Sequence, residues 1–360
     1  MSEIPGSGGV KLGGPTATGA RMLEVDDLRV SFATEDGLLT AVGGVSFDVG
    51  PKEIVAIVGE SGSGKSVTAQ TIMGLTRSPN TQISGSVRFR GEELVNASDT
   101  ELQEIRGNEI AMIFQDPMTS MNPVYRVGKQ MVEAIRTHRD ISPEEARQRA
   151  IEMLDAVGIP APEQRIDNYP HEFSGGMRQR AMIAMGLAME PSLLIADEPS
   201  TALDVTIQAQ IIRLLQRLNR EHDLAVIIIT HDLGVVAEIA DRVLVMYAGR
   251  VVEQGTLDEI FYDPQHPYTW GLLGSLTRLD RPRPRRLPQI KGLPPSLVAP
   301  PTGCAFRPRC PHAFGRCTEM PELTSSLPEA TGHLDRCWKS PDEKRKLREV
   351  EGRIGLEAPA

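Results

Sequence analysis

The stretch Gly59–Ser66, with the sequence GESGSGKS, has residue types and spacing suited to binding phosphate groups. Its glycines let the backbone wrap around a phosphate and direct N–H groups inward, at the positive end of the helix expected to follow. The Lys65 ammonium is expected to reach the β- and γ-phosphates of a nucleotide, and the Ser66 hydroxyl to bind Mg²⁺. The predicted loop comprises Gly59, Glu60, Ser61, Gly62, Ser63, Gly64, Lys65, Ser66 and Val67.

Two acidic residues, Asp197 and Glu198, directly follow the apolar run Leu193–Ala196. Such a run is typical of a buried parallel strand, and parallel sheets bind ligands at the carboxyl ends of their strands. Phosphoryl transfer depends mainly on positioning and charge stabilisation. We therefore expect Asp197 to hold Mg²⁺ and Glu198 to polarise the water that attacks a phosphate.

A second anion-binding pattern opens a predicted helix at Ser174, Gly175, Gly176 and Met177. Backbone N–H groups at a helix start attract anions, and glycines allow a phosphate to approach closely. A chain with two such helix starts suggests a nucleotide held between two copies of the same domain.

The four cysteines all lie near the C-terminus, where little else is expected to form a core. Four thiolates suit either a tetrahedral Zn²⁺ or a 4Fe-4S cluster. Zinc sites favour a tight pair of ligands, whereas the gaps here are long, so the spacing favours iron; zinc and four unliganded thiols remain alternatives. The candidate ligands are Cys304, Cys310, Cys317 and Cys337, with His312 and His333 as spare ligands.

The elements that must position these residues alternate between strands and helices. Residues 22–49 alternate in the way expected of antiparallel β-structure. Parallel-type strands are predicted at 53–58, 110–115, 193–197, 225–230 and 242–246, and helices at 143–157, 176–189 and 204–221.

Composition divides the chain into four regions. These are a flexible glycine-rich tail (1–20), a nucleotide-binding domain (21–263), a proline-rich region with the cysteines (264–340) and a charged tail (341–360). The basic run Arg281–Arg286 is interpreted as a solvated linker, with contact to anionic lipid or a partner as the alternative.

The overall composition is that of an ordinary globular chain. Of 360 residues, 40% are hydrophobic and 24% charged, and the net charge of −9 disfavours non-specific nucleic-acid binding. Apolar runs fall far short of the ~18–20 residues that a membrane span requires, and the N-terminus lacks the apolar core of a signal peptide. We expect a cytoplasmic protein that would serve any membrane process through partners.

In combination and order, these motifs resemble those of the ATP-binding-cassette (ABC) ATPases, over roughly residues 22–263. The resemblance implies an α/β fold. Its parts are a P-loop NTPase core with a mostly parallel sheet, an antiparallel β subdomain and an α-helical signature subdomain, followed here by the Pro/Cys-rich C-terminal extension. It also implies ATP and Mg²⁺ as ligands.

The resemblance assigns further roles residue by residue. Phe32 takes the place of the aromatic that stacks on adenine, although ordinary strand packing is the alternative. Gln115 corresponds to the glutamine that contacts Mg²⁺ and the attacking water, and His231 to the histidine that contacts the γ-phosphate. Asp204 lies in the loop that communicates across the dimer. Ser174–Met177 match the signature that contacts ATP on the opposite subunit; the departures at Phe173 and Met177 affect only contacts needing a glutamine side chain.

Three further stretches, at 115–123, 169–180 and 266–269, resemble the ATPases of oligopeptide and dipeptide importers. The function implied is ATP-driven dimer closure that powers peptide import. Related importers of nickel, glutathione or antimicrobial peptides share these stretches, and a soluble ABC ATPase of DNA repair or translation is disfavoured by the net charge and the single cassette. Some ATPases of this branch carry an iron–sulfur cluster in the tail.

The implied partners are a second ABC ATPase subunit, identical or paralogous, and two transmembrane permease subunits. An extracellular solute-binding protein acts through the permease, and no nucleic acid is expected. The implied location is peripheral, on the cytoplasmic face of the plasma membrane.

Overall fold

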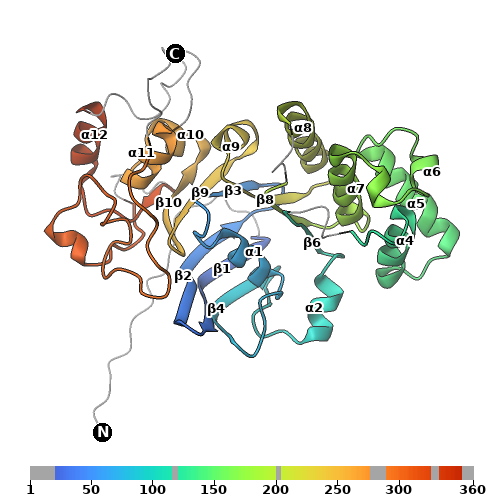
Figure 1. The fold of residues 1–360 in the computed structure, drawn as a ribbon, viewed down its shortest axis with the longest axis horizontal. Coiled ribbons are helices and arrows are strands. Elements are labelled where there is room, and N and C mark those ends of the chain that lie inside the picture. The colour runs from blue at the N-terminus through green and yellow to red at the C-terminus, as the bar shows by residue number, and fades with distance from the viewer. Residues whose placement is uncertain (1–20, 116–120, 200–203, 276–288, 326–331, 351–360) are drawn as a thin grey trace, which may run out of the picture.

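A computed structural model describes residues 21–115, 121–199, 204–275, 289–325 and 332–350. The predicted flexible tail (1–20), the basic run Arg281–Arg286 and most of the segment following Gln115 lie outside these residues. The described chain forms two sheets with helices around them (Figure 1).

The central sheet has seven strands in the order β11-β10-β9-β3-β8-β7-β6. Its parallel part comprises β6 (Ile110–Ile113), β7 (Leu193–Asp197), β8 (Ala225–Thr230), β3 (Ile54–Val58) and β9 (Arg242–Tyr247). The strands β10 (Arg250–Thr256) and β11 (Leu334–Asp335) extend it in antiparallel fashion. The carboxyl ends of β6, β7, β8 and β3 therefore meet along one edge, where ligands of such sheets bind.

An antiparallel sheet covers one face of the central sheet. Its order is β2-β1-β4-β5, with β1 at Leu23–Thr34, β2 at Gly37–Val49, β4 at Thr81–Phe89 and β5 at Glu92–Glu93. A buried cluster joins the two sheets, and α1 (Lys65–Ile72) contributes Ala69 and Ile72 to it. The helix α2 (Asp99–Ile105) adds Leu102.

Helices cover the other face of the central sheet. Alternate side chains of the central strands point to opposite sides, so apolar side chains on this face also need to be covered. The core there includes buried residues of α7 (Gly175–Leu187), α8 (Val205–Glu221) and α9 (Leu233–Ile239). A helical arm extends from this face and holds α4 (Val127–His138), α5 (Pro143–Ala156), α6 (Pro162–Arg165) and the short η1 (Pro170–Glu172) (Figure 1). These features confirm the predicted α/β class with antiparallel and helical subdomains.

The C-terminal region packs directly on the core, so the expectation that it lacks apolar material to hold it was wrong. It contains α11 (Pro267–Gly274), η2 (Gly315–Thr318) and β11; α10 (Leu257–Tyr262) precedes it and α12 (Pro341–Val350) follows it. Tyr268 and Phe306 are buried and belong to the main core cluster. Within the expected charged tail, Lys344 of α12 is also buried and forms an ion pair with Asp335 at 2.7 Å.

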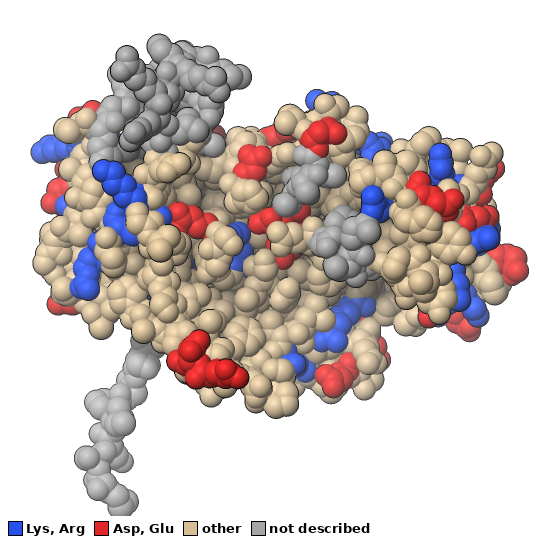
Figure 2. Space-filling view, in the orientation of Figure 1, with Lys and Arg blue, Asp and Glu red and all other residues tan. Residues whose placement is uncertain are grey.

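Acidic and basic side chains are interspersed over the visible face of the molecule (Figure 2). Among the helices that the structure describes, none combines the length and apolarity needed to cross a bilayer.

Candidate active site

The predicted phosphate-binding loop connects β3 to α1, as the pattern requires. Gly59 and Gly64 adopt positive φ angles of 153° and 99°. A Cβ atom would lie 2.2 Å from the Met246 carbonyl oxygen at Gly59, and 2.4 Å from that of Ala41 at Gly64. Only glycine fits both positions, because the backbone of neighbouring strands approaches the loop so closely.

Lys65 lies inside this loop rather than in solvent. Its Nζ atom donates hydrogen bonds to the carbonyl oxygens of Gly59 at 2.9 Å and Glu60 at 3.0 Å. Burial lowers the pKa of Lys65, while the nearby carboxylates of Glu198 and Asp197 act to raise it. A phosphate in the loop would supply the negative charge that a buried ammonium requires.

Two of the three predicted magnesium ligands, Ser66 and Asp197, lie in contact. The Ser66 hydroxyl donates a hydrogen bond to Oδ1 of Asp197 at 3.0 Å. Burial raises the pKa of Asp197, and the Ser66 hydrogen bond opposes that shift. An oxygen-only donor pair with one buried carboxylate fits Mg²⁺, which usually takes its remaining ligands from water and substrate phosphates.

Glu198 is contacted from both sides by side chains of neighbouring strand ends. The Gln115 amide donates to Oε2 of Glu198 at 3.0 Å, and Nδ1 of His231 lies 3.2 Å from Oε1. Glu198 itself has a positive φ of 48°, a conformation that costs a non-glycine residue free energy. The strand order thus gathers the predicted catalytic side chains at one point.

The signature residues lie elsewhere, at the start of α7 and away from α1 (Figure 1). Ser174 caps this helix and accepts a hydrogen bond from the Met177 N–H at 3.3 Å. A Cβ atom at Gly176 would lie 2.9 Å from Ile207 on α8, so glycine allows the two helices to approach. Asp204 caps α8 by accepting from the Ile207 N–H at 2.9 Å.

Phe32, the predicted adenine-stacking residue, is half-buried on β1 and packs against the cluster between the sheets.

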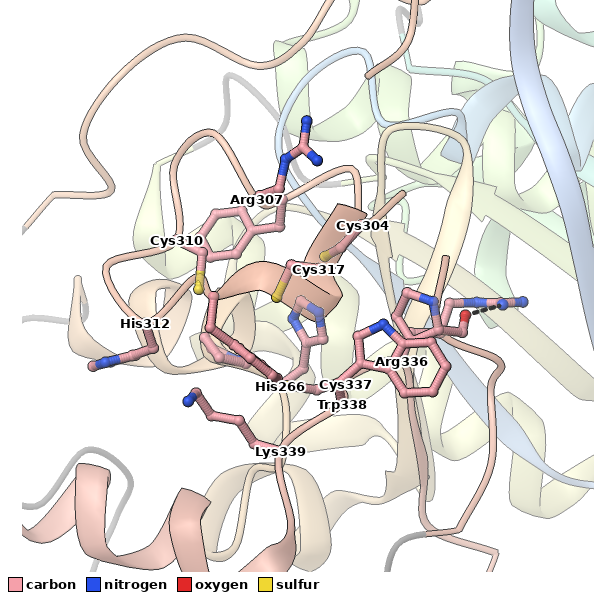
Figure 3. Close-up of a pocket in the computed structure, with 14 residues that line it drawn as sticks. His266, Cys304, Arg307, Cys310, His312, Cys317, Arg336, Cys337, Trp338 and Lys339 are labelled. Atoms are coloured by element: carbon pink, nitrogen blue, oxygen red, sulfur yellow. Dashed lines mark hydrogen bonds between the residues drawn. The ribbon is translucent and has the colours of Figure 1, made fainter. Parts of the chain in front are cut away.

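The four cysteines line one pocket of the C-terminal region together with His312 (Figure 3). Burial raises the pKa of Cys310 to about 11 and that of Cys337 to about 12. Across the described ranges, however, no three or more His, Cys, Asp or Glu residues are grouped so that they could hold a metal ion. The predicted metal site is therefore not confirmed, and a single-ion zinc site does not fit this arrangement.

His333 was wrongly proposed as a spare ligand. Its Nε2 atom lies 2.8 Å from Oε1 of the fully buried Glu253, which also accepts from the backbone N–H of His266 at 2.9 Å. This histidine fastens β11 to β10 instead of facing the cysteines.

Two residues of the C-terminal region reach the phosphate-binding loop, and sequence reasoning missed both. The Arg309 guanidinium forms two hydrogen bonds with the Glu60 carboxylate, at 2.5 and 3.0 Å. The Tyr268 hydroxyl accepts the Glu60 N–H at 2.8 Å. Tyr268 belongs to a stretch singled out by its resemblance, whereas no local pattern links Arg309 to a partner 249 positions away.

Comparison with known proteins gives matches to two families. The family described as ABC transporter matches residues 42–201, and the one described as oligopeptide/dipeptide transporter, C-terminal region, matches residues 252–317. The chain is 57% identical over 295 residues to the oligopeptide transport ATP-binding protein OppD of Bacillus subtilis, covering 82% of each chain. It is 53% identical to OppD of Salmonella typhimurium, covering 89% of this chain and 95% of that one.

Solved structures give the same picture for the nucleotide domain. A post-hydrolysis dimer of the ATP-binding cassette MJ0796 with ADP and Pi superimposes with a TM-score of 0.60 at 28% identity, covering 66% of this chain and 99% of that one. CbiO1 of Clostridium perfringens, part of an ABC transporter complex, gives a TM-score of 0.57 at 30% identity, covering 67% and 90%.

Proposed function

This chain belongs to the ATP-binding proteins of the ABC transporter family, in the oligopeptide and dipeptide branch, and we propose that it powers peptide import by hydrolysing ATP. The observation that carries the proposal is the contact of Glu198 with both Gln115 and His231, beside the Ser66–Asp197 pair. Together these residues supply a water-positioning carboxylate, its two supports and a place for a divalent cation.

The residues divide the chemistry between them. The loop N–H groups and Lys65 bind and neutralise the phosphates of ATP, while Phe32 stacks on adenine. Glu198 orients and polarises the attacking water. Gln115 and His231 contact its carboxylate, and with ATP bound Gln115 would also contact the water and His231 the γ-phosphate. Mg²⁺ held by Ser66 and Asp197, with Gln115 nearby, would neutralise charge on the phosphate oxygens. Catalysis by positioning and charge stabilisation is the general pattern of phosphoryl transfer.

ATP closes a head-to-tail dimer in this proposal, with a second copy or a paralogous ATPase as partner. Ser174 and the glycines after it would contact the γ-phosphate bound to the opposite subunit, and Asp204 would relay closure across the dimer. The placement of α7 away from α1 supports a role for Ser174 at a nucleotide other than the one held by its own loop. Cross-linking of α7 to the partner's phosphate-binding loop in the presence of ATP tests this arrangement.

The membrane subunits dock on the helical arm, at the cytoplasmic face of the plasma membrane. A groove between α4 and α5 is lined by Tyr125, Arg126, Lys129 and Val132, among others. Val124, beside it, is 70% exposed. In the sequence the groove residues begin shortly after Gln115, the residue that contacts Glu198, so we expect a helix inserted there to influence the position of Glu198. Tyr125→Ala should spare ATP binding but abolish stimulation by the permease.

The names of the relatives favour peptides as the solute over nickel, glutathione or antimicrobial peptides. The test is reconstitution with two permease subunits and the solute-binding protein in vesicles. ATP-dependent accumulation of a labelled oligopeptide is expected. Basal ATPase activity without stimulation by permease or peptide would favour a soluble role instead.

We also infer that the four cysteines bind a 4Fe-4S cluster with a structural role. The proposal rests on the four cysteines lining one pocket, because four thiolates are the usual ligands of such a cluster. Anaerobic purification followed by iron, sulfide and zinc counts tests this, with Cys310→Ser as the comparison. A colourless, metal-free protein with a folded C-terminal region would overturn it.

A further inference from the structure

Every polar group of Glu60 is engaged. Its carboxylate accepts two hydrogen bonds from Arg309, its N–H donates to Tyr268, and its carbonyl oxygen accepts from Lys65. Two of these three attachments come from the C-terminal region, and the third is made by the lysine expected to contact the phosphates. Glu60 thus contacts both the C-terminal region and Lys65, and so links the two.

Arg309 is held rigidly enough to act as a support. Its side chain is only 5% exposed. Its Nε atom donates to the Lys291 carbonyl oxygen at 3.1 Å, and Nη2 donates to that of Ile290 at 3.3 Å. A tight turn fixes its backbone, since the N–H groups of Arg309 and Cys310 both donate to the Phe306 carbonyl oxygen at 2.9 Å.

Tyr268, the second contact, is fixed by aromatic packing. Its ring centroid lies 4.6 Å from that of Tyr247 and 5.4 Å from that of Phe306. Tyr247 also accepts a hydrogen bond from Arg309 at 3.4 Å. Both supports of Glu60 therefore belong to one packed unit rather than to independent surface contacts.

The same part of the C-terminal region lies beside the catalytic residues. One pocket is lined by Gly59, Glu60 and His231 on one side and by Ile290, Gly292 and Arg309 on the other. The phosphate-binding loop is exposed at Ser61 and Gly62, the two residues that follow Glu60. Contacts from the C-terminal region to Glu60 therefore influence the positions of the loop N–H groups and of Lys65.

We propose that Arg309 is a positioning residue of the nucleotide site, which fixes Glu60 and thereby sets the geometry of Lys65 and the phosphate-binding loop. The C-terminal region then contributes to ATP affinity, beyond any role in transport specificity or metal binding. A bidentate arginine–carboxylate pair is both strong and geometrically specific, which suits this role. The inference rests on the nucleotide site assigned above.

The test uses the full-length protein and measures three quantities for each variant: the ATP dissociation constant, the KM and kcat of hydrolysis, and the melting temperature. Misplacement of catalytic groups by ~1 Å costs up to ~100-fold, so Arg309→Ala should raise the dissociation constant and KM by about 10- to 100-fold. Arg309→Lys keeps the charge but loses the paired geometry, and should rescue only in part. Glu60→Gln combined with Arg309→Ala should bind ATP no worse than Arg309→Ala alone, because both changes remove one interaction.

Arg348→Ala is the matched control. Arg348 follows the C-terminal region and forms an ion pair with Asp263, which precedes it, and neither residue belongs to the phosphate-binding loop. The Arg348→Ala substitution should lower the melting temperature and leave ATP affinity unchanged. Tyr268→Phe keeps the ring packing and removes only the acceptor of the Glu60 N–H, so it tests the same support if Arg309→Ala does not fold; it too should weaken ATP binding.

These outcomes distinguish failure of the Arg309 proposal from failure of the assigned nucleotide site. The proposal is overturned if Arg309→Ala, or Tyr268→Phe where Arg309→Ala does not fold, binds and hydrolyses ATP within twofold of the unmodified protein, whatever its melting temperature. Failure of the unmodified protein to bind ATP would instead contradict the assigned nucleotide site.

Discussion

The Nε2 atom of Gln115 donates a hydrogen bond of 3.0 Å to Oε2 of Glu198, which joins the end of β6 to the end of β7. The two residues are 83 positions apart, and the parallel pairing of their strands brings them together. In the sequence, Gln115 also lies shortly before the groove proposed to bind the membrane subunits. A displacement of Gln115 would thus act directly on the carboxylate expected to position the attacking water.

Glu198→Gln should slow turnover strongly while retaining ATP binding. The amide is nearly isosteric but cannot polarise water as a carboxylate does. Loss of one electrostatic or water-positioning group typically costs ~10²–10³ in rate. Single-turnover hydrolysis and size-exclusion chromatography with ATP should show slow cleavage and accumulated dimer. Glu238→Gln on the exposed side of α9 is the matched control, and normal hydrolysis by Glu198→Gln would mean that another group positions the water.

Ser66→Ala should weaken Mg²⁺-dependent binding more than binding of ATP alone. The substitution removes one oxygen donor and leaves the buried Asp197 carboxylate without its hydrogen bond. Loss of groups that hold or orient metal ligands commonly costs about 10- to 100-fold in metal affinity. Titration of Mg²⁺ at fixed ATP measures the shift. An unchanged Mg²⁺ requirement would place the cation away from Ser66.

The sequence predicts the central strands and the edge of the sheet that holds the catalytic side chains, because each strand is marked by the residue types within it. Predicted and observed bounds agree at Leu193–Asp197 and at Ala225–Thr230, where an unbroken apolar run marks a strand buried on both faces. Once such strands are parallel, residues that follow them must gather at one edge. Asp197, Glu198 and His231 lie where this reasoning places them.

The contacts of the C-terminal region do not follow in this way, because their partners are distant in sequence. Nothing in the sequence around Arg309 or around Glu60 indicates that these two residues interact. His333 was assigned to the cysteines on residue type, but burial beside Glu253 decides its partner. Phe306 looks isolated among prolines, yet the fold packs its ring against both Tyr247 and Tyr268.

The Glu253–His333 pair should make stability depend on pH. Burial opposes protonation of His333, but its hydrogen bond to Glu253 and the charge of that carboxylate raise its pKa above the usual value. Its contribution is therefore fully present below the unfolded pKa of ~6.5 and is lost as pH rises through the higher folded value. His333→Gln should lower stability by about 3 kcal/mol at mildly acidic pH. Melting temperatures of both proteins from pH ~6 to ~9 should converge as the pH rises; a gap that widens instead would contradict a protonated His333.

Phe306→Ala should destabilise the protein and loosen the C-terminal region from the nucleotide domain. The ring is 2% exposed and contacts Tyr247 and Tyr268 edge-on, at centroid distances of 5.3 and 5.4 Å. Truncation of a buried phenylalanine leaves a cavity and typically costs ~3–5 kcal/mol. Phe314→Ala provides the control, since Phe314 lies in the same region but is 42% exposed and should cost less than ~1 kcal/mol. Thermal unfolding and limited proteolysis should show earlier melting and cleavage within residues 289–310 for Phe306→Ala only. Equal effects of the two substitutions would indicate that the region is held by its surface contacts, and that the aromatic cluster behind Glu60 contributes little to its attachment.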